Sequence, residues 1–152
     1  MGRTFSGIEE LRACAGEHLG YSDWHEVSQA QVDLFAEATG VHQWIHVDPE
    51  RARRESPFGG PVAHGYLTLS LAPVLLAQVI SVGGVSMGVN YGCNKVRFPA
   101  PVPVGSKIRL GATLSSVEEI AGGAQVVMGL VFEVDGQDKP SCVAEAVYRY
   151  YA

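Results

Sequence analysis

Apolar and polar residues follow two different spacings along the chain, helical in the first half and strand-like in the second. Ser28 and Gln31 form a capping box ahead of apolar residues spaced as on one helix face, which predicts a helix over residues 28–38. An aspartate followed by a proline has the pattern of an N-cap and a first helical residue, so we expect a short helix over residues 48–54. The first half is therefore predicted to be helical and rich in loops.

Residues 66–81 are nearly all apolar or small, which predicts a helix buried on nearly all of its sides. Pro73 lies inside this segment and predicts a local kink or a break in the helical hydrogen bonds. Polar residues interrupt the apolar stretch, and it is shorter than the roughly 20 residues that a membrane-spanning helix needs. We therefore expect the central helix of a globular core and no membrane partner.

Strand spacing governs the second half, where apolar residues alternate with polar ones between turn signals. The glycine pair at residues 122–123 and the Asp-Gly pair at residues 135–136 are expected to form turns. The predicted strands cover residues 85–91, 95–98, 108–114, 126–132 and 142–151. One sheet and one long helix must share a core, so we expect an α+β fold in which a bent antiparallel sheet wraps a central helix, as a single domain over residues 1–152.

Composition narrows the classes of protein to which the chain can belong. A length of 152 residues suits one domain, and 47% hydrophobic with 18% charged residues excludes a disordered chain. A net charge of −5 argues against nucleic acid as the main partner, because phosphate binding requires clustered lysines and arginines. The three cysteines lack metal-ligand spacing, and the N-terminus has no apolar signal sequence. These features predict a cytoplasmic protein with free thiols and no metal site.

The segment that carries the candidate chemistry contains Thr39-Gly40, Ile45-His46 and Ala52. Two further runs follow in order: Ala63-His64-Gly65 before the central helix, then Asn90-Tyr91-Gly92 with residues 95–102 in the strand half. At these positions, and over nearly its whole length, the chain resembles the MaoC-like (R)-specific enoyl-thioester hydratases. Their signature is a small residue and Gly, then Asp, a variable residue, Asn, Pro, an aliphatic residue and His, with an Ala further on.

The resemblance implies a hot-dog fold and a reaction on an acyl thioester. In such hydratases an Asp and a His orient and deprotonate the water that adds to C3 of a 2-enoyl thioester, and the reverse reaction is a dehydration. By this resemblance His46 is the base, and Gly65 offers its backbone N–H to the carbonyl oxygen, which gains charge as the enolate forms. The substrate would be carried on coenzyme A or an acyl carrier protein, without another cofactor. The protein would be a homodimer joined through its strand half.

One position departs from the family signature. The catalytic Asp of the family falls on Val41, which can neither accept a proton nor hold a water. His46 then acts as the sole base, a role that the near-neutral pKa of histidine permits. His42, Asp48 and a partner subunit are candidates for the missing group, and we expect Val41 to lie beside His46 and to face the pocket.

Five further residues are predicted to bind the substrate. Gln43 and Trp44 replace the Asn and Pro of the signature, and Trp44 is a candidate for the wall of the acyl pocket or for the core. His64 precedes the oxyanion glycine, where it can hold the loop through hydrogen bonds, and Tyr66 follows that glycine. Arg97, Lys95 and Lys107 are candidates for contact with the phosphates of the carrier.

The leading hypothesis is a hydratase or dehydratase that interconverts a trans-2-enoyl thioester and an (R)-3-hydroxyacyl thioester. A first alternative is a thioesterase, because hot-dog folds also support thioester hydrolysis, but no signature for that reaction is visible. A second alternative is a subunit that binds an acyl thioester, or supports a catalytic hot-dog partner, without chemistry of its own. The loss of the Asp favours this second alternative, whereas the retention of His46 and Gly65 counts against it.

Overall fold

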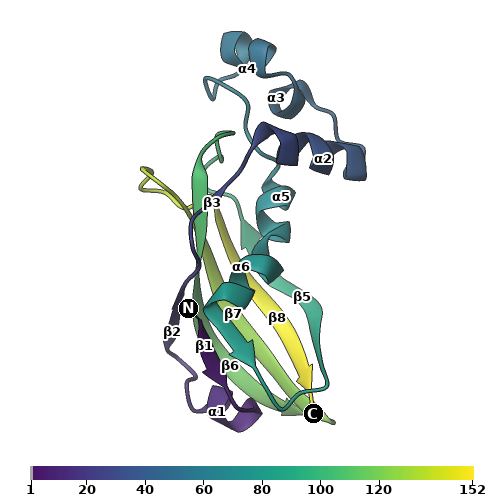
Figure 1. Cartoon of the computed structure of the whole chain (residues 1–152), viewed down its shortest axis with the longest axis vertical. Helices are drawn as coiled ribbons and strands as arrows, with labels where there is room; N and C mark the ends of the chain where they lie inside the picture. The colour runs from purple at the N-terminus through teal and green to yellow at the C-terminus, as the bar shows by residue number, and fades with distance from the viewer. Residues whose placement is uncertain (1) are drawn as a thin grey trace.

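A long, curved antiparallel sheet and a pair of helices on its inner face form the body of the molecule, and further helices form a lobe at one end (Figure 1). The structure is a computed structural model that describes residues 2–152. The helices are α1 (Ile8–Arg12), α2 (Gln29–Thr39), α3 (Trp44–Val47), α4 (Pro49–Glu55), α5 (Gly65–Ser70) and α6 (Ala72–Val79). The strands are β1 (Arg3–Phe5), β2 (His18–Tyr21), β3 (His25–Glu26), β4 (Ile80–Val82), β5 (Met87–Arg97), β6 (Lys107–Ile120), β7 (Gly123–Val134) and β8 (Cys142–Tyr151).

Strands β6, β7 and β8 form the centre of the larger sheet, whose strand order is β2-β6-β7-β8-β5, with β3 also paired to β6. These pairs are all antiparallel, and the register places Leu110 opposite Phe132 and Leu130 opposite Ala144. Strands β1 and β4 form a separate parallel pair. The prediction of an α+β fold with an antiparallel sheet around a central helical segment is confirmed.

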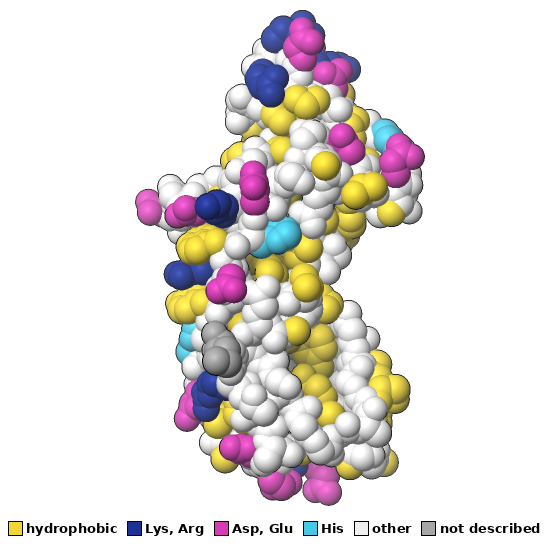
Figure 2. All heavy atoms as spheres, in the orientation of Figure 1, with side chains coloured by type: hydrophobic (Ala, Val, Ile, Leu, Met, Phe, Trp, Pro, Cys, Tyr) yellow, Lys and Arg dark blue, Asp and Glu magenta, His cyan; other side chains and the backbone are white. Residues whose placement is uncertain are grey.

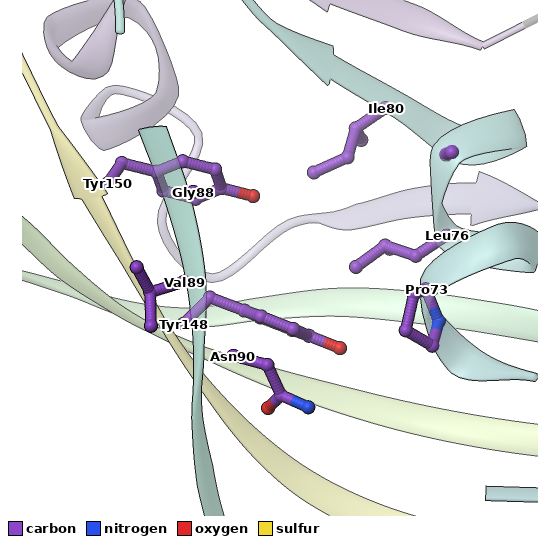
Figure 3. A pocket seen from close by; sticks show the side chains of 9 residues that line it. Pro73, Leu76, Ile80, Gly88, Val89, Asn90, Tyr148 and Tyr150 are labelled. Carbon is purple, nitrogen blue, oxygen red and sulfur yellow. The ribbon is translucent and has the colours of Figure 1, made fainter. Parts of the chain in front are cut away.

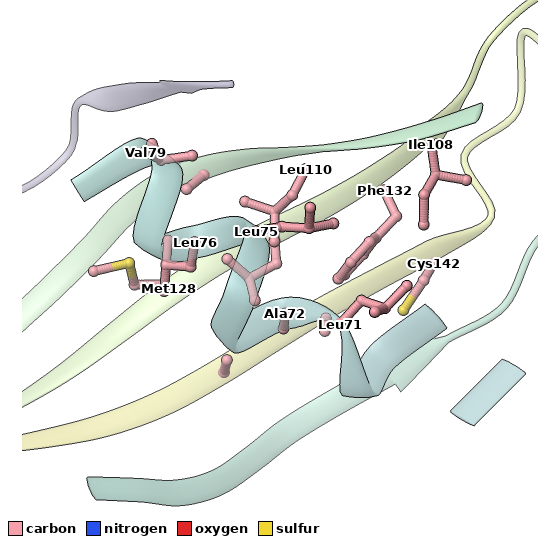
Figure 4. Close-up of a cluster of buried hydrophobic side chains, with 14 of the residues drawn as sticks. Leu71, Ala72, Leu75, Leu76, Val79, Ile108, Leu110, Met128, Phe132 and Cys142 are labelled. Carbon is pink, nitrogen blue, oxygen red and sulfur yellow. The ribbon is translucent and has the colours of Figure 1, made fainter. Parts of the chain in front are cut away.

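The core lies between α6 and the inner face of the sheet (Figure 4). Leu75 and Leu76 of α6 are buried, and the strands supply Leu110, Met128 and Phe132, which are 0% exposed. Strict alternation along β6 and β7 places every second side chain against the helix. Burial of each such leucine or phenylalanine contributes roughly 1.5–3 kcal/mol, so this layer holds the helices to the sheet.

The segment predicted as one helix forms two helices, α5 and α6, which are separated at Leu71. Pro73 lies in the first turn of α6, where a proline has no N–H to donate to the preceding turn, so the predicted break is confirmed. The prediction of burial on nearly all sides is wrong, since Tyr66 is 71% and Val74 is 57% exposed. One face of the helix pair meets the sheet, and an apolar sequence does not reveal which of its faces has a neighbour.

The two helices predicted from their caps are confirmed as α2 and α4. The Ser28 hydroxyl accepts a hydrogen bond from the Gln31 backbone N–H at 3.1 Å, and the Asp48 carboxylate accepts one from the Arg51 N–H at 3.1 Å. The strands predicted at residues 108–114 and 126–132 are inner parts of the longer β6 and β7, and residues 142–151 form β8.

The two short strands predicted at residues 85–91 and 95–98 form one edge strand, β5. Its register against β8 shifts between Asn90 and Gly92 and again between Cys93 and Lys95. Such bulges interrupt the alternation of side chains, which explains why one strand gave the pattern of two. Strands β1 to β4 and the short helices α1 and α3 were not predicted, and residues 80–81 of β4 had been assigned to the end of the central helix.

Candidate active site

His46 lies on α3, a single helical turn in the lobe, and its residue surface is 8% exposed. Its Nδ1 atom is 2.6 Å from the Val62 carbonyl oxygen. A carbonyl oxygen can only accept, so in the neutral ring Nδ1 carries the proton and Nε2 keeps a free lone pair. The Val62 backbone thereby selects the tautomer in which Nε2 can act as a base.

Burial also keeps this imidazole in its neutral form. Desolvation lowers the pKa of His46 from its usual value of 6.5, and the neighbouring His64 ring lowers it further, whereas the hydrogen bond to Val62 opposes this shift. Neutral imidazole is the form that accepts a proton. His46 is therefore ready to act as a base at neutral pH.

His64 packs directly on His46. The two imidazole rings are stacked with their centroids 4.0 Å apart and their planes inclined by 25°. At the edge of the same ring, the Nε2 of His64 lies 3.2 Å from the Val41 carbonyl oxygen, to which it donates. His64 therefore connects the backbone of the 40s loop to the candidate base, as expected for a residue that holds the loop.

One cavity of about 330 Å³ brings His46 and Gly65 together. Gly65 begins α5, and its backbone N–H has no hydrogen-bond acceptor within the described chain, because it precedes the first helical hydrogen bond. Phe98 covers the glycine so closely that a Cβ added to Gly65 would lie 3.1 Å from its ring. The remaining lining residues are Ile45, Phe58, Val62, Ala63, Thr68, Pro99, Ala100, Pro101, Val102 and Ser141.

This cavity has the parts that addition of water to an enoyl thioester requires. It offers a neutral imidazole as the base and a free backbone N–H as the donor to a developing oxyanion, within largely apolar walls. Of the lining residues, His46 and Gly65 were predicted as site residues, whereas Thr68, Phe98 and Ser141 are among those that were not. Thr68 follows Gly65 by three residues, the spacing of one helix face, so that signal was present in the sequence.

Val41 does not face the cavity, so the expectation for this position is wrong. Its backbone carbonyl oxygen binds His64, but its side chain is 46% exposed and is not part of the cavity lining. The two other candidates for the missing group are also outside the cavity. His42 is exposed beside Glu37 at 2.9 Å, and Asp48 caps α4.

None of the five predicted substrate-binding residues is part of the cavity lining. Gln43 is exposed and supplies the carbonyl oxygen that accepts from the His46 backbone N–H at 3.0 Å. Trp44 is half-buried beneath the Arg51 guanidinium, which lies 4.3 Å from its ring centroid. Tyr66 meets Phe98 edge to face at 6.0 Å, whereas Arg97 is exposed on β5 and donates to a neighbouring carbonyl.

A second hollow runs between α6 and β5, and Figure 2 shows hydrophobic side chains on its walls. This groove of about 300 Å³ is bounded by Pro73, Leu76 and Ile80 on one side, and Figure 3 shows the Tyr148 and Tyr150 hydroxyls and Asn90 on the other. Burial raises the pKa of Tyr148 to about 12, so its hydroxyl stays protonated. A neighbouring hollow that contains Tyr66 shares Pro73, Asn90 and Tyr148 with this groove and extends it toward α5.

Residues 2–152 contain neither a candidate metal site nor a candidate membrane-spanning helix. No group of three or more His, Cys, Asp and Glu side chains is arranged to hold a metal ion. None of the helices described has the length and apolar character needed to cross a membrane.

A curved sheet around a helix pair, with a base and a free N–H at one end, is the architecture of a hot-dog protein that acts on thioesters. The MaoC-like domain family matches residues 10–134, and the chain belongs to this family, as predicted. It is 53% identical over 151 residues to a protein of Mycobacterium tuberculosis named 3-hydroxyacyl-thioester dehydratase Z, with 99% of each chain covered.

Two solved structures confirm the hot-dog fold. The monoamine oxidase regulatory protein of Archaeoglobus fulgius superposes with a TM-score of 0.78 at 23% identity, covering 100% of this chain and 99% of that chain. The (R)-hydratase from A. caviae involved in PHA biosynthesis gives a TM-score of 0.68 at 23% identity, covering 88% and 94% of the two chains.

Proposed function

We propose that this chain is a hydro-lyase that interconverts a trans-2-enoyl thioester and an (R)-3-hydroxyacyl thioester. The observation that carries the proposal is the meeting of the His46 imidazole and the free Gly65 N–H in one cavity. The family and the relative named a 3-hydroxyacyl-thioester dehydratase support the same reaction class.

The chemistry follows from the two groups. In hydration, Nε2 of His46 removes one proton from water while the water oxygen forms a bond to C3. The C2–C3 double-bond electrons shift toward the carbonyl, and the Gly65 N–H donates to the oxygen on which negative charge develops. The protonated His46 then gives this proton to C2, which restores the neutral imidazole and completes the addition of one water. Dehydration follows the same path in reverse.

The groove between α6 and β5 supports an acyl thioester as substrate. Its apolar walls and its extension along the helix pair toward Tyr66 suit an extended acyl chain whose thioester end lies near Gly65. We propose coenzyme A or an acyl carrier protein as the carrier, no further cofactor and no metal ion.

We also propose a homodimer in the cytoplasm, joined through the outer edge of β5. This edge has no partner strand in the part of the chain that the structure describes, and Met87, Tyr91 and Phe98 are exposed along or beside it. An open strand edge with apolar side chains favours pairing with a second copy. Light scattering at micromolar concentration tests this, and a monomer would contradict it.

The test of the activity is incubation of the purified protein with crotonyl-CoA and with a long-chain 2-enoyl-CoA, followed by the loss of the enoyl absorbance. We expect water addition to at least one substrate and a product of R configuration by chiral chromatography. A thiol reagent in a parallel sample reports hydrolysis. Release of free coenzyme A without formation of a 3-hydroxyacyl product would establish the thioesterase alternative, and binding of acyl-CoA without either reaction would establish the binding subunit.

A further inference from the structure

Thr68 is a polar residue of the cavity that has no role in the proposed chemistry. It is 2% exposed, yet it lines the same cavity as His46 and Gly65. Residues three apart lie on one face of a helix, so Thr68 follows Gly65 along the side of α5 that faces the cavity. A polar side chain thus stands one turn beyond the free N–H, among apolar walls.

The hydroxyl of Thr68 is free, unlike those of other helical residues in the chain. The hydroxyls of Thr39 and Ser70 donate to carbonyl oxygens of their own helices, each at 2.7 Å. Ser141, which also lines the cavity, donates to the Phe132 carbonyl at 3.2 Å. Within residues 2–152 the Thr68 hydroxyl has no such partner, and its oxygen is not sealed from the cavity.

A buried hydroxyl without a partner is unfavourable unless a ligand or a water occupies the site. The cavity offers such a water two contacts, the Thr68 hydroxyl on α5 and the imidazole on α3. The carboxylate that the family uses beside this base is absent at Val41, whose side chain lies outside the cavity lining. A water held by Thr68 and His46 would have one hydrogen directed to each.

We infer that Thr68 is a catalytic residue that holds the attacking water in place of the family's carboxylate, an inference that rests on the proposed hydration. The Thr68 oxygen accepts one O–H of the water, and Nε2 of His46 accepts the other and removes that proton as oxygen bonds to C3. Thr68 gains and loses no proton in the step. It restricts the orientation of the water so that a lone pair points at C3.

A matched set of variants tests this inference. Thr68→Ser and Thr68→Ala both remove the methyl group, and only Thr68→Ala also removes the hydroxyl. We expect Thr68→Ala to lower kcat by about 10- to 100-fold with KM changed by less than about threefold, and Thr68→Ser to retain most of the activity. Thr68→Val, which keeps the shape, should match Thr68→Ala. Thr113→Val on strand β6, which is not part of the active-site cavity or of the groove between α6 and β5, is the control for removal of a threonine hydroxyl.

The pH profile separates a chemical role from a structural one. Because His46 remains the base, the acid side of the kcat/KM profile should stay in place in Thr68→Ala. Equal loss in Thr68→Ser and Thr68→Ala, or full activity in Thr68→Ala, would overturn the inference while leaving the proposed function intact. A wild-type protein that hydrates neither enoyl-CoA would overturn the proposed function, and the inference with it.

Discussion

The two ends of the helix pair α5–α6 lie in different surroundings. Along α6, the leucines pack against strand residues that are fully buried, and the apolar surfaces fill one another (Figure 4). At the start of α5, the helix faces a cavity of about 330 Å³ in which a backbone N–H and a hydroxyl have no partner within the described chain. Unfilled space and unpaired polar groups both reduce stability, and they occur together where a substrate would supply the missing contacts.

This difference in packing distinguishes the residues along α6, which stabilise the fold, from the residues at the start of α5, which carry the reaction. A change in the filled region should alter the free energy of unfolding and leave the chemistry of each folded molecule intact. A change at the cavity should do the reverse, because its residues already lack part of their contacts. The following predictions test that separation.

The largest expected effect is that of His46→Gln. Glutamine can still donate to the Val62 carbonyl but cannot remove a proton from water, so we expect kcat to fall by about 10²- to 10⁴-fold. The free energy of unfolding in urea should change little. If activity and stability were lost together, His46 would belong with the residues that hold the fold.

Leu75→Ala should produce the opposite outcome. The side chain is 1% exposed between α6 and the sheet, and its removal leaves a cavity that costs about 2–5 kcal/mol of stability. Urea denaturation measures this loss, while kcat per folded molecule should remain near the wild-type value. Its neighbour Val74 is 57% exposed, so Val74→Ala is a matched control that should change stability by less than about 0.5 kcal/mol.

The sequence was most informative where local chemistry determines structure. Caps at Ser28 and Asp48 located two helices, and alternation located three central strands, because both signals act over a few residues. The first three strands are short and paired with distant segments, so no local pattern marks them. Which face of α5–α6 is covered likewise depends on neighbours that are remote in sequence.

In the candidate site, too, features fixed by local sequence were predicted, and features that depend on remote neighbours were not. The motif located His46 and Gly65, since their spacing is fixed along the chain. It did not reveal Phe98, which reaches Gly65 from beyond β5, nor the Val62 carbonyl that sets the tautomer of His46. It also gave no indication that Val41 would contact His64 through its backbone carbonyl and leave its side chain exposed, because that arrangement depends on the packing of the lobe against α5.

Val41→Asp tests whether a carboxylate can still assist the reaction from the family's position. The Val41 side chain is 46% exposed and outside the cavity lining, so a carboxylate there would not reach the water between Thr68 and His46. We therefore expect hydration of a short enoyl-CoA to change by less than about threefold. Val41→Asn, which has the same shape without the charge, is the control. A rise of about tenfold or more in Val41→Asp alone would show that the family's position still reaches the water, and it would count against Thr68 in that role. A wild type that binds acyl-CoA and hydrates nothing, with or without Val41→Asp, would favour the binding subunit.

Gly65→Ala should reduce activity without loss of stability. The added Cβ would lie 3.1 Å from the Phe98 ring, which must move by a few tenths of an ångström and narrow the space beside the N–H. We expect kcat/KM to fall by about tenfold, while alanine in the first turn of α5 leaves the melting temperature unchanged or slightly higher. In Gly7→Ala the new Cβ would meet nothing within 4 Å, so this variant controls for the substitution itself. Wild-type kinetics in Gly65→Ala would place the thioester elsewhere.

The smallest expected effect is on the pH dependence of kcat/KM, which distinguishes His46 from His42 as the base. Burial lowers the pKa of His46 below 6.5, whereas the hydrogen bond to Glu37 raises the pKa of the exposed His42 above 6.5. A base works when deprotonated, so if His46 is the base, kcat/KM stays level as pH falls to about 6.5 and declines only below it. Folding stability should weaken over the same interval, because the unfolded chain binds a proton there before His46 does. A decline that begins above pH 6.5 and disappears in His42→Gln would assign the base to His42 instead.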